Sequence, residues 1–311
     1  MFIRSFKQLS KDDILIAGGK GASLGEMTKA KISVPQGFVI LAISFDRFLE
    51  ETDLNVEIEA KSHKVNLKNI NSVEQISNEI QNLIFDAQFP KDIAKEIEKE
   101  FSKLKSKYVA VRSSATAEDS KVASWAGELE SYLNTTRNNL LENVKKCWAS
   151  LFTPRAIFYR LEKNLHKTKV SVAVVIQKMI QSEISGICFT VHPITKNHDQ
   201  IVIEAGYGLG EAIVGGIITP DTYVVHKIEG NILDKNINKQ EKMIVKKKGG
   251  NVEKQVSKSK QEKQKLNDRQ ILKLTEISKK IEIHYKSPQD IEWAFAKDKF
   301  YIVQSRPITT L

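Results

Sequence analysis

Residues 290–306 read Asp-Ile-Glu-Trp-Ala-Phe-Ala-Lys-Asp-Lys-Phe-Tyr-Ile-Val-Gln-Ser-Arg, and this stretch decides how the end of the chain folds. Two runs rich in apolar and aromatic residues, 291–296 and 300–305, flank a polar Lys-Asp-Lys segment. Such a pattern is typical of a β-hairpin. The sequence therefore predicts two antiparallel strands joined by a turn at 297–299.

A three-residue turn fixes which side chains of this hairpin are neighbours. It places Glu292 opposite Gln304 and Asp290 opposite Arg306, and all four project from one face because side chains alternate along a strand. The opposite face is then an apolar core face that contains Ile291, Trp293, Phe295, Tyr301 and Val303. A two-residue turn would change these pairings.

The polar face of the hairpin has a composition that suits a metal ion bound to phosphates. The carboxylate of Glu292 and the amide oxygen of Gln304 are oxygen ligands of the kind that Mg²⁺ prefers. Asp290 and Arg306 lie beyond them in the predicted register. The alternative is a two-sided sheet whose polar face is simply solvated.

A second candidate site follows the short apolar strand predicted at 108–111. Arg112 comes at its end and is followed by hydroxyl-bearing and small residues at 113–117. A guanidinium binds phosphate oxygens through two hydrogen bonds, and hydroxyl groups can complete such a site. The alternative is that Arg112 pairs with Glu118 or Asp119 at the surface.

Two glycine-rich stretches are predicted to form turns, and the first is a candidate phosphate-binding site. At 18–25, the glycines would allow backbone N–H groups to converge on an anion, and Lys20 adds a positive charge. This is not a Walker A loop, because Gly21 stands where Ser or Thr is required. The second stretch, 206–211, ends in glutamate where a Rossmann fingerprint needs glycine, so it predicts a tight strand-to-helix turn.

The remaining pattern predicts an α+β protein with two lobes and mixed β-sheets. Helical spacing covers about 73–106, with a break at Pro90. Further helices are predicted at about 139–152 and 267–285, and apolar strands at 170–177, 185–191, 200–205 and 222–228.

The charge of the chain is concentrated in one region. Of a net charge of +10 over 311 residues, most arises between Lys235 and Lys265, where eleven lysines face three acidic residues. This stretch has no interleaved aromatic residues and no nucleic-acid motif, so we interpret it as a solvent-facing ribbon and linker. The alternative is a nucleic-acid-binding module, which predicts binding that depends steeply on salt.

Cysteine usage and hydropathy point to a cytoplasmic protein. Cys147 and Cys188 lie far apart, each in an apolar stretch, which is typical of buried free thiols. No apolar run approaches the ~20 residues that cross a bilayer. The N-terminus has no apolar core of a signal peptide.

These motifs together resemble the N-terminal ATP-binding domain of the family of phosphoenolpyruvate synthase, pyruvate phosphate dikinase and rifampin phosphotransferase. The resemblance extends over essentially the whole chain, and its ordered blocks are highly specific in combination. The blocks are residues 18–21, 111–119, 125–127, 177–179, 185–190, 204–211, 219–221, 288–293 and 304–307.

The resemblance implies an ATP-grasp fold in which two lobes, about 1–169 and 170–311, clamp ATP. It implies that Lys20 and Arg112 hold the phosphates, and that Gly127 and Ser131 belong to a flap above them.

The resemblance also assigns roles to residues nearer the C-terminus. Gln177 is expected at the adenine edge. Glu292 and Gln304 match the magnesium-binding positions, and Arg306 matches a phosphate contact. ATP and Mg²⁺ are the expected cofactors, and Lys20, Arg112 and Arg306 are the expected catalytic residues.

In the family, ATP gives its β-phosphate to a histidine on another domain, and AMP is left. The phosphohistidine domain and the domain that binds phosphoenolpyruvate or pyruvate are absent from this sequence. We therefore expect a phosphohistidine-domain protein to act in trans. The alternatives are the ATP half of an enzyme like rifampin phosphotransferase, or a non-catalytic ATP-binding sensor.

Overall fold

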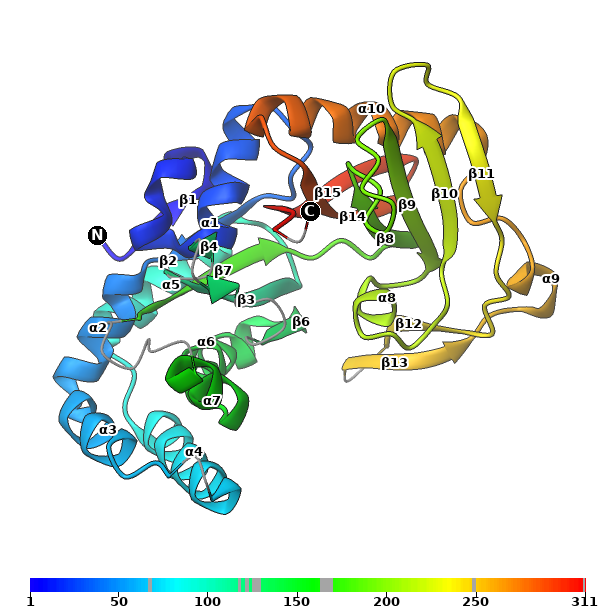
Figure 1. The fold of residues 1–311 in the computed structure, drawn as a ribbon. Helices are drawn as coiled ribbons and strands as arrows, with labels where there is room; N and C mark the ends of the chain where they lie inside the picture. The colour runs from blue at the N-terminus through cyan, green and yellow to red at the C-terminus, as the bar shows by residue number, and fades with distance from the viewer. Residues whose placement is uncertain are drawn as a thin grey trace. The chain divides into compact units, whose positions relative to one another are not determined.

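The computed structural model describes residues 1–66, 69–116, 119, 120, 123, 124, 130–162, 170–247, 250–309 and 311. The chain forms two compact units. Unit 1 comprises Met1–Glu26 and Gln36–Met179, and unit 2 comprises Met27–Pro35 and Ile180–Leu311. Both units combine helices with β-sheets, so the chain is α+β, as the sequence predicts (Figure 1).

Unit 1 is built on a five-stranded sheet with the order β1-β2-β7-β3-β6. The described pairings are antiparallel throughout, whereas mixed sheets were expected from the sequence. The strands are β1 Ile3–Ser5, β2 Gly37–Ile40, β3 Val109–Ala115, β6 Ser131–Thr135 and β7 Val172–Lys178. A separate short pair joins β4 Asp119–Ser120 to β5 Ala123–Ser124.

Helices pack on one face of this sheet, where alternate residues of the strands contribute apolar side chains to the core. Val111, Val174 and Ile176 lie in one core cluster with Trp148, which stacks on Phe48 at 5.0 Å between ring centroids. The helices of unit 1 are α1 Ile14–Lys29, α2 Ala42–Glu51, α3 Leu54–Ser62, α4 Ile70–Asp86, α5 Lys91–Lys103, α6 Leu140–Ala149 and α7 Pro154–Glu162. Pro90 separates α4 from α5, as predicted.

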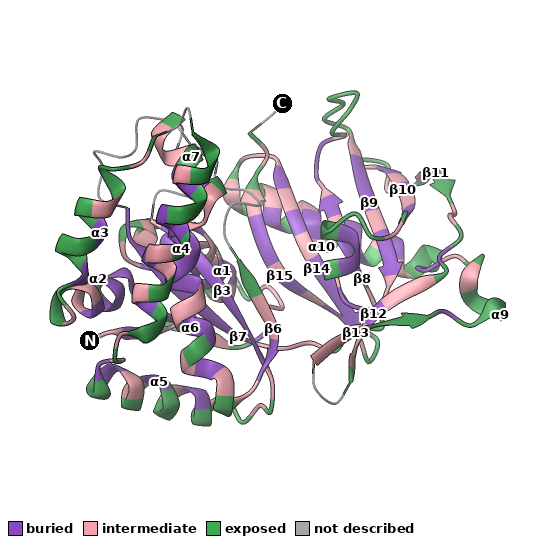
Figure 2. Cartoon of the chain, turned by 90° about the horizontal axis from the view of Figure 1, so that it is seen from below, coloured by how far each residue is buried: buried purple, intermediate pink, exposed green. Residues whose placement is uncertain are grey.

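Unit 2 contains a six-stranded antiparallel sheet with the order β11-β10-β9-β8-β14-β15. Its strands are β8 Ile184–Phe189, β9 Gln200–Tyr207, β10 Asp221–His226, β11 Ile232–Asn236, β14 Gln289–Ala296 and β15 Lys299–Pro307. Helix α10, Asp268–Tyr285, packs on one face, where the Cys188 thiol contacts the Ser278 hydroxyl at 3.1 Å. The other face is half-buried, and Figure 2 shows β14 and β15 banded in buried and intermediate residues.

The boundary between the units differs from the expected lobe limit at 169/170. Strand β7 belongs to unit 1, because it pairs with both β2 and β3. Residues 27–35 belong to unit 2, where the Ile302 N–H donates to the Ser33 carbonyl at 2.9 Å. Apolar strands of the two sheets have similar composition, so the sequence does not reveal which sheet takes β7.

The Lys-rich stretch 235–265 forms the end of β11, the hairpin of β12 (Lys242–Lys247) and β13 (Gly250–Gln255), and the short helix α9 (Lys258–Gln261). Much of it is exposed, as the predicted ribbon requires. Several of its lysines pair with carboxylates: Lys235 with Asp268, Lys239 with Glu241, and Lys242 with Glu253.

Candidate functional site

The C-terminal hairpin has the predicted pairs of opposite residues, but its turn is shorter than predicted and one strand contains a β-bulge. Its turn has two residues, Lys297 and Asp298, with φ of 51° and 57°. Positive φ at both positions is typical of the tight turn that matches strand twist. Val303 is then an extra residue, because the register shifts between the pairs of Trp293 with Ile302 and Glu292 with Gln304. This β-bulge offsets the shorter turn.

Two predictions for the hairpin are therefore confirmed and one is wrong. Glu292 lies opposite Gln304, and Asp290 lies opposite Arg306. The core face near the turn, however, takes Phe300 and Ile302 instead of Tyr301 and Val303. The short turn moves this part of β15 by one residue, which exchanges the faces of its side chains.

The charged pair at the end of the hairpin, Asp290 and Arg306, forms two direct hydrogen bonds. Arg306 donates from Nε at 2.8 Å and from Nη2 at 2.7 Å to Oδ2 of Asp290. Burial raises the pKa of Asp290, and the charge of Glu292 adds to that rise, whereas Arg306 opposes it. The carboxylates on this face thus disfavour each other's charge.

Glu204 belongs to the same polar face, and sequence reasoning missed it. It lies opposite Ile187, which in turn lies opposite Glu292, so one row crosses the sheet from β15 to β9. Burial raises the pKa of Glu204, and the charge of Asp290 raises it further. The sequence does contain a signal that could have identified Glu204: it is the single acidic residue within the mainly apolar strand 200–207. Carboxylates placed together in this way are stabilised by a nearby cation.

In unit 1, the polar face of the sheet collects three of the predicted site residues. Arg112 is buried and lies opposite Ser131, at the start of β6. Gln177 lies opposite Ala110, two residues from Arg112, and therefore faces the same side. Its Nε2 is buried and has no hydrogen-bond partner among the residues that the structure describes.

The glycine-rich stretch is a helix with a kink and not the expected loop. Gly18 has φ of 66°, and α1 continues beyond it through Lys20. The Gly21 N–H donates to the Ser114 hydroxyl at 3.3 Å, and that hydroxyl donates to the Ala17 carbonyl at 3.0 Å. These contacts hold the segment bearing Lys20 against the end of β3, two residues beyond Arg112.

Replacing Gly18 with alanine should disrupt this contact. A Cβ at Gly18 would lie 2.2 Å from the Ser114 hydroxyl and 2.3 Å from its carbonyl oxygen. Gly216 is a matched control, because it has φ of 65° but a Cβ there meets nothing within 4 Å. Chemical denaturation should show a loss of about 1–2 kcal/mol for Gly216→Ala, and a clearly larger loss for Gly18→Ala. Equal losses would contradict the packing argument.

Two predicted features lie wholly or partly outside the described residues. Gly127 is one. The alternative partners of Arg112 are the other, since Glu118 and the side chain of Asp119 are likewise not described.

The second glycine-rich stretch forms the predicted tight turn from β9 to α8 (Glu211–Val214). Gly208 has φ of 92°, and its carbonyl accepts hydrogen bonds from the Ser182 and Ser185 hydroxyls, both at 2.8 Å. The Leu209 N–H donates to the Ile244 carbonyl in β12 at 2.9 Å. Because the backbone polar groups of this turn bond to the protein itself, its role is structural.

Comparisons with known proteins identify the family of this chain. Residues 14–311 match the family described as pyruvate phosphate dikinase, AMP/ATP-binding domain. The chain is 43% identical over its full length to a probable phosphoenolpyruvate synthase of Methanothermobacter thermautotrophicus, and covers 46% of that protein. It is 45% identical over 97% of its length to another from Archaeoglobus fulgidus, and covers 41% of it. A rifampicin phosphotransferase of Bacillus subtilis is 39% identical over 98% of this chain, which covers 35% of that relative.

The chain thus spans less than half the length of these curated relatives. The α+β architecture described above is that of an ATP-grasp-like nucleotide-binding domain. Because the family match covers nearly every residue, this chain belongs to the family of pyruvate phosphate dikinase AMP/ATP-binding domains.

Proposed function

We propose that this chain is the ATP-binding phosphotransferase part of a phosphoenolpyruvate synthase-like system, and that it transfers the β-phosphate of ATP to a histidine on a separate domain. The observation that supports this most is the row of Gln304, Glu292 and Glu204 beside the Asp290–Arg306 pair, in a chain of an AMP/ATP-binding family. Phosphoryl transfer depends mainly on positioning and charge neutralisation, which such residues supply without a protein nucleophile in this chain.

In unit 1, Lys20 and Arg112 hold phosphate oxygens, with Gly127 and Ser131 in the flap. Gln177 binds the adenine edge. Its buried Nε2 is a donor that lacks an acceptor among the described residues, and a ring nitrogen of adenine is an acceptor of the right kind. An unsatisfied buried donor is costly in the free protein, so a ligand that satisfies it gains binding energy.

In unit 2, Glu292 and Gln304 hold Mg²⁺, and Arg306 contacts a phosphate. Among the described residues, no group of three or more His, Cys, Asp or Glu side chains is placed to hold a metal ion. Mg²⁺ keeps several waters and takes phosphate oxygens in place of a complete protein cage, so two protein ligands are enough for the proposed site. When bound, the ion neutralises charge on the phosphates.

The acceptor histidine belongs to a phosphohistidine-domain protein that acts in trans, and the reaction takes place in the cytoplasm. Free, buried Cys147 and Cys188 suit a reducing compartment. None of the described helices is both long enough and apolar enough to span a membrane. A role like that of rifampicin phosphotransferase is the second candidate, because the Bacillus subtilis relative is 39% identical, but the two phosphoenolpyruvate synthases named above are more similar.

Calorimetric titration with ATP and Mg²⁺, followed by an AMP assay with an added phosphohistidine domain, tests the proposal. We expect binding by the chain itself, and AMP only when the histidine domain is present. Binding without AMP would instead identify a nucleotide sensor. Absence of binding would contradict the proposal altogether.

The adenine assignment has its own test in Gln177→Leu. Removing the donor should weaken ATP binding by about five- to ten-fold, since one hydrogen bond is lost. Because the amide is unsatisfied in the free chain, the same change should not lower the melting temperature. Gln289→Leu is the matched control, since Gln289 is buried but bonds to Ser287 and Ser305, and its replacement should destabilise the fold. Unchanged ATP affinity in Gln177→Leu would refute the assignment.

A further inference from the structure

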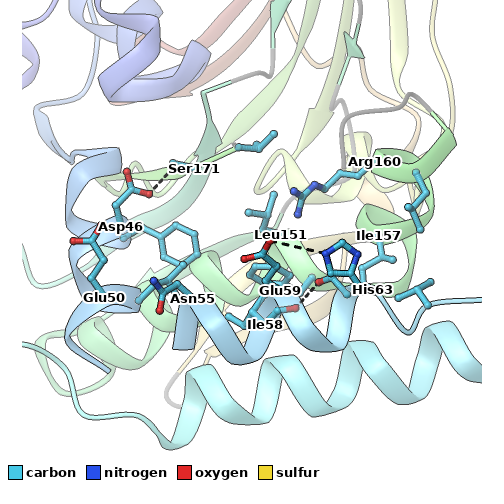
Figure 3. A pocket seen from close by; sticks show the side chains of 17 residues that line it. Asp46, Glu50, Asn55, Ile58, Glu59, His63, Leu151, Ile157, Arg160 and Ser171 are labelled. Carbon is cyan, nitrogen blue, oxygen red and sulfur yellow. Dashed lines mark hydrogen bonds and ion pairs between the residues drawn. The ribbon is translucent and has the colours of Figure 1, made fainter. Parts of the chain in front are cut away.

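Unit 1 contains a pocket of about 880 Å³ that the proposed function does not use (Figure 3). It lies among α2, α3, α7, the 3-10 helix Ser150–Phe152 and the segment that leads into β7. Its volume is within the range of small-molecule sites, roughly 300–1,000 Å³, and its walls combine apolar side chains with polar and charged ones. The apolar lining includes Phe45, Leu49, Ile58, Leu151, Ile157 and Val170.

This pocket is separated from the nucleotide site by the sheet of unit 1. Phe45 belongs to the core cluster that contains Val172, Val174 and Ile176. Along β7 these side chains alternate with Gln177, which shares the opposite face with Arg112. A molecule in the pocket therefore lies on the helical side of the sheet, away from Arg112.

Arg160 gives the pocket its chemical character. Figure 3 shows its side chain extending from α7 into the pocket. Its Nε is buried, and within the described residues the guanidinium has no hydrogen bond or ion pair. Burial lowers the pKa of Arg160, with no acidic group acting against that effect. The chain segment that follows α7, 163–169, reads Lys-Asn-Leu-His-Lys-Thr-Lys and contains no carboxylate.

An arginine desolvated in this way without a partner is unfavourable, because buried charges are normally paired. Two of the three carboxylates that line the pocket have other contacts, and the third, Glu50, is exposed to solvent. Glu59 lies 3.9 Å from Nε2 of His63, and Asp46 accepts a hydrogen bond from the Ser171 hydroxyl at 2.6 Å. Arg160 is thus available to an anion that enters from solution.

We propose that this pocket binds a small organic monocarboxylate, whose carboxylate pairs with Arg160 and whose apolar body contacts the walls. A single negative charge is selected, because Asp46, Glu50 and Glu59 also line the pocket and repel further negative charge. The same repulsion excludes nucleotides and other polyanions. The site is independent of the phosphotransfer reaction.

Octanoate is the probe for this site, and octan-1-ol is its uncharged counterpart. By calorimetry, we expect octanoate to bind with a Kd on the order of 1 mM or below, and octan-1-ol to bind more weakly. Arg160→Met should weaken octanoate binding by about ten-fold or more. Arg155→Met, which removes the same charge from the exposed side of α7, should not. Saturating ATP should leave octanoate affinity unchanged.

Stability measurements without ligand separate this role from a structural one. If Arg160 is unpaired, Arg160→Met keeps or raises the melting temperature, whereas loss of a structural ion pair would lower it. A lowered melting temperature, equal octanoate affinity in Arg160→Met, or competition by ATP would each overturn the proposal. Ile58→Trp, which fills the pocket but leaves Arg160 in place, should also abolish octanoate binding, and retained binding would overturn the proposal too.

Discussion

Replacing Glu292 with glutamine is expected to lower phosphoryl transfer to a supplied histidine domain by roughly 100- to 1,000-fold. Glu292 faces Gln304 on the half-buried side of the unit 2 sheet, where its carboxylate is the charged ligand of the proposed ion site. Glutamine keeps the size of the side chain but removes the charge that neutralisation of the phosphates requires. The rate of AMP formation measures the effect.

The same variant should fold at least as well as the unmodified chain. Burial raises the pKa of Asp290 and the charge of Glu292 adds to that rise, so the two carboxylates repel each other even though Arg306 contacts Asp290. Glu292→Gln removes that repulsion, and its melting temperature without ligands should be equal or higher. Glu276→Gln, on the exposed side of α10, is the control that should change neither property. Full transfer activity in Glu292→Gln would show that the site assignment is wrong.

The hairpin shows what a sequence can and cannot reveal about such a site. Alternation along 290–306 is a local property, but it predicts that Glu292 lies opposite Gln304 only if the turn has three residues. Turn length was not predictable, since Lys297-Asp298-Lys299 suits two or three residues. No sequence motif predicts the β-bulge at Val303. This extra residue brings Glu292 and Gln304 opposite each other although the turn is shorter.

Features that depend on sheet order were beyond local reasoning. Glu204 joins the site only because β9 lies next to β8, and β8 next to β14. Nothing near residue 204 encodes that order. Likewise, the change of pattern to strands at about residue 170 predicts that residues 170–177 belong to the second lobe, although β7 pairs with β2 and β3. The position of Glu204 and the sheet to which β7 belongs both depend on pairing between strands distant in sequence, and not on local strand propensity.

The helix at Gly18–Gly21 illustrates a third limit. Glycine usually disfavours helices, so this stretch was interpreted as a loop. The structure shows that Gly18 is needed where the chain kinks and contacts Ser114 closely, and that Gly21 allows its N–H to reach the Ser114 hydroxyl. Gly18 packs closely against Ser114 of β3 and Gly21 against Val39 of β2, and such contacts between distant parts of the chain cannot be predicted from the local sequence.

The largest expected effect on stability concerns Asp221, at the start of β10. Asp221 and Lys265 form an ion pair with 2.7 Å between Oδ1 and Nζ, and both side chains are 0% exposed. Oδ1 also accepts the Asn238 N–H at 2.9 Å, and Oδ2 accepts the Tyr223 hydroxyl at 2.7 Å and the Lys265 N–H at 2.9 Å. Asp221 therefore fastens both ends of the 238–265 segment to β10.

Asp221→Ala should lower the free energy of unfolding by about 3–5 kcal/mol, because it leaves the Lys265 ammonium buried without a counter-charge. Hydrogen exchange of the β10 amides measures this loss within unit 2. Glu253→Ala is the matched control, since it breaks the exposed Lys242–Glu253 pair and should cost at most about 1 kcal/mol.

A double replacement separates the buried charge from the lost hydrogen bonds. Asp221→Leu with Lys265→Met removes both charges, so it should recover a large part of the stability that Asp221→Ala loses, as apolar replacements of buried ion pairs generally do. If Asp221→Ala costs no more than Glu253→Ala, the pair does not hold the segment. If the double variant is as unstable as the single one, the hydrogen bonds to Asn238 and Tyr223, and not the ammonium, are the reason that Asp221 stabilises unit 2.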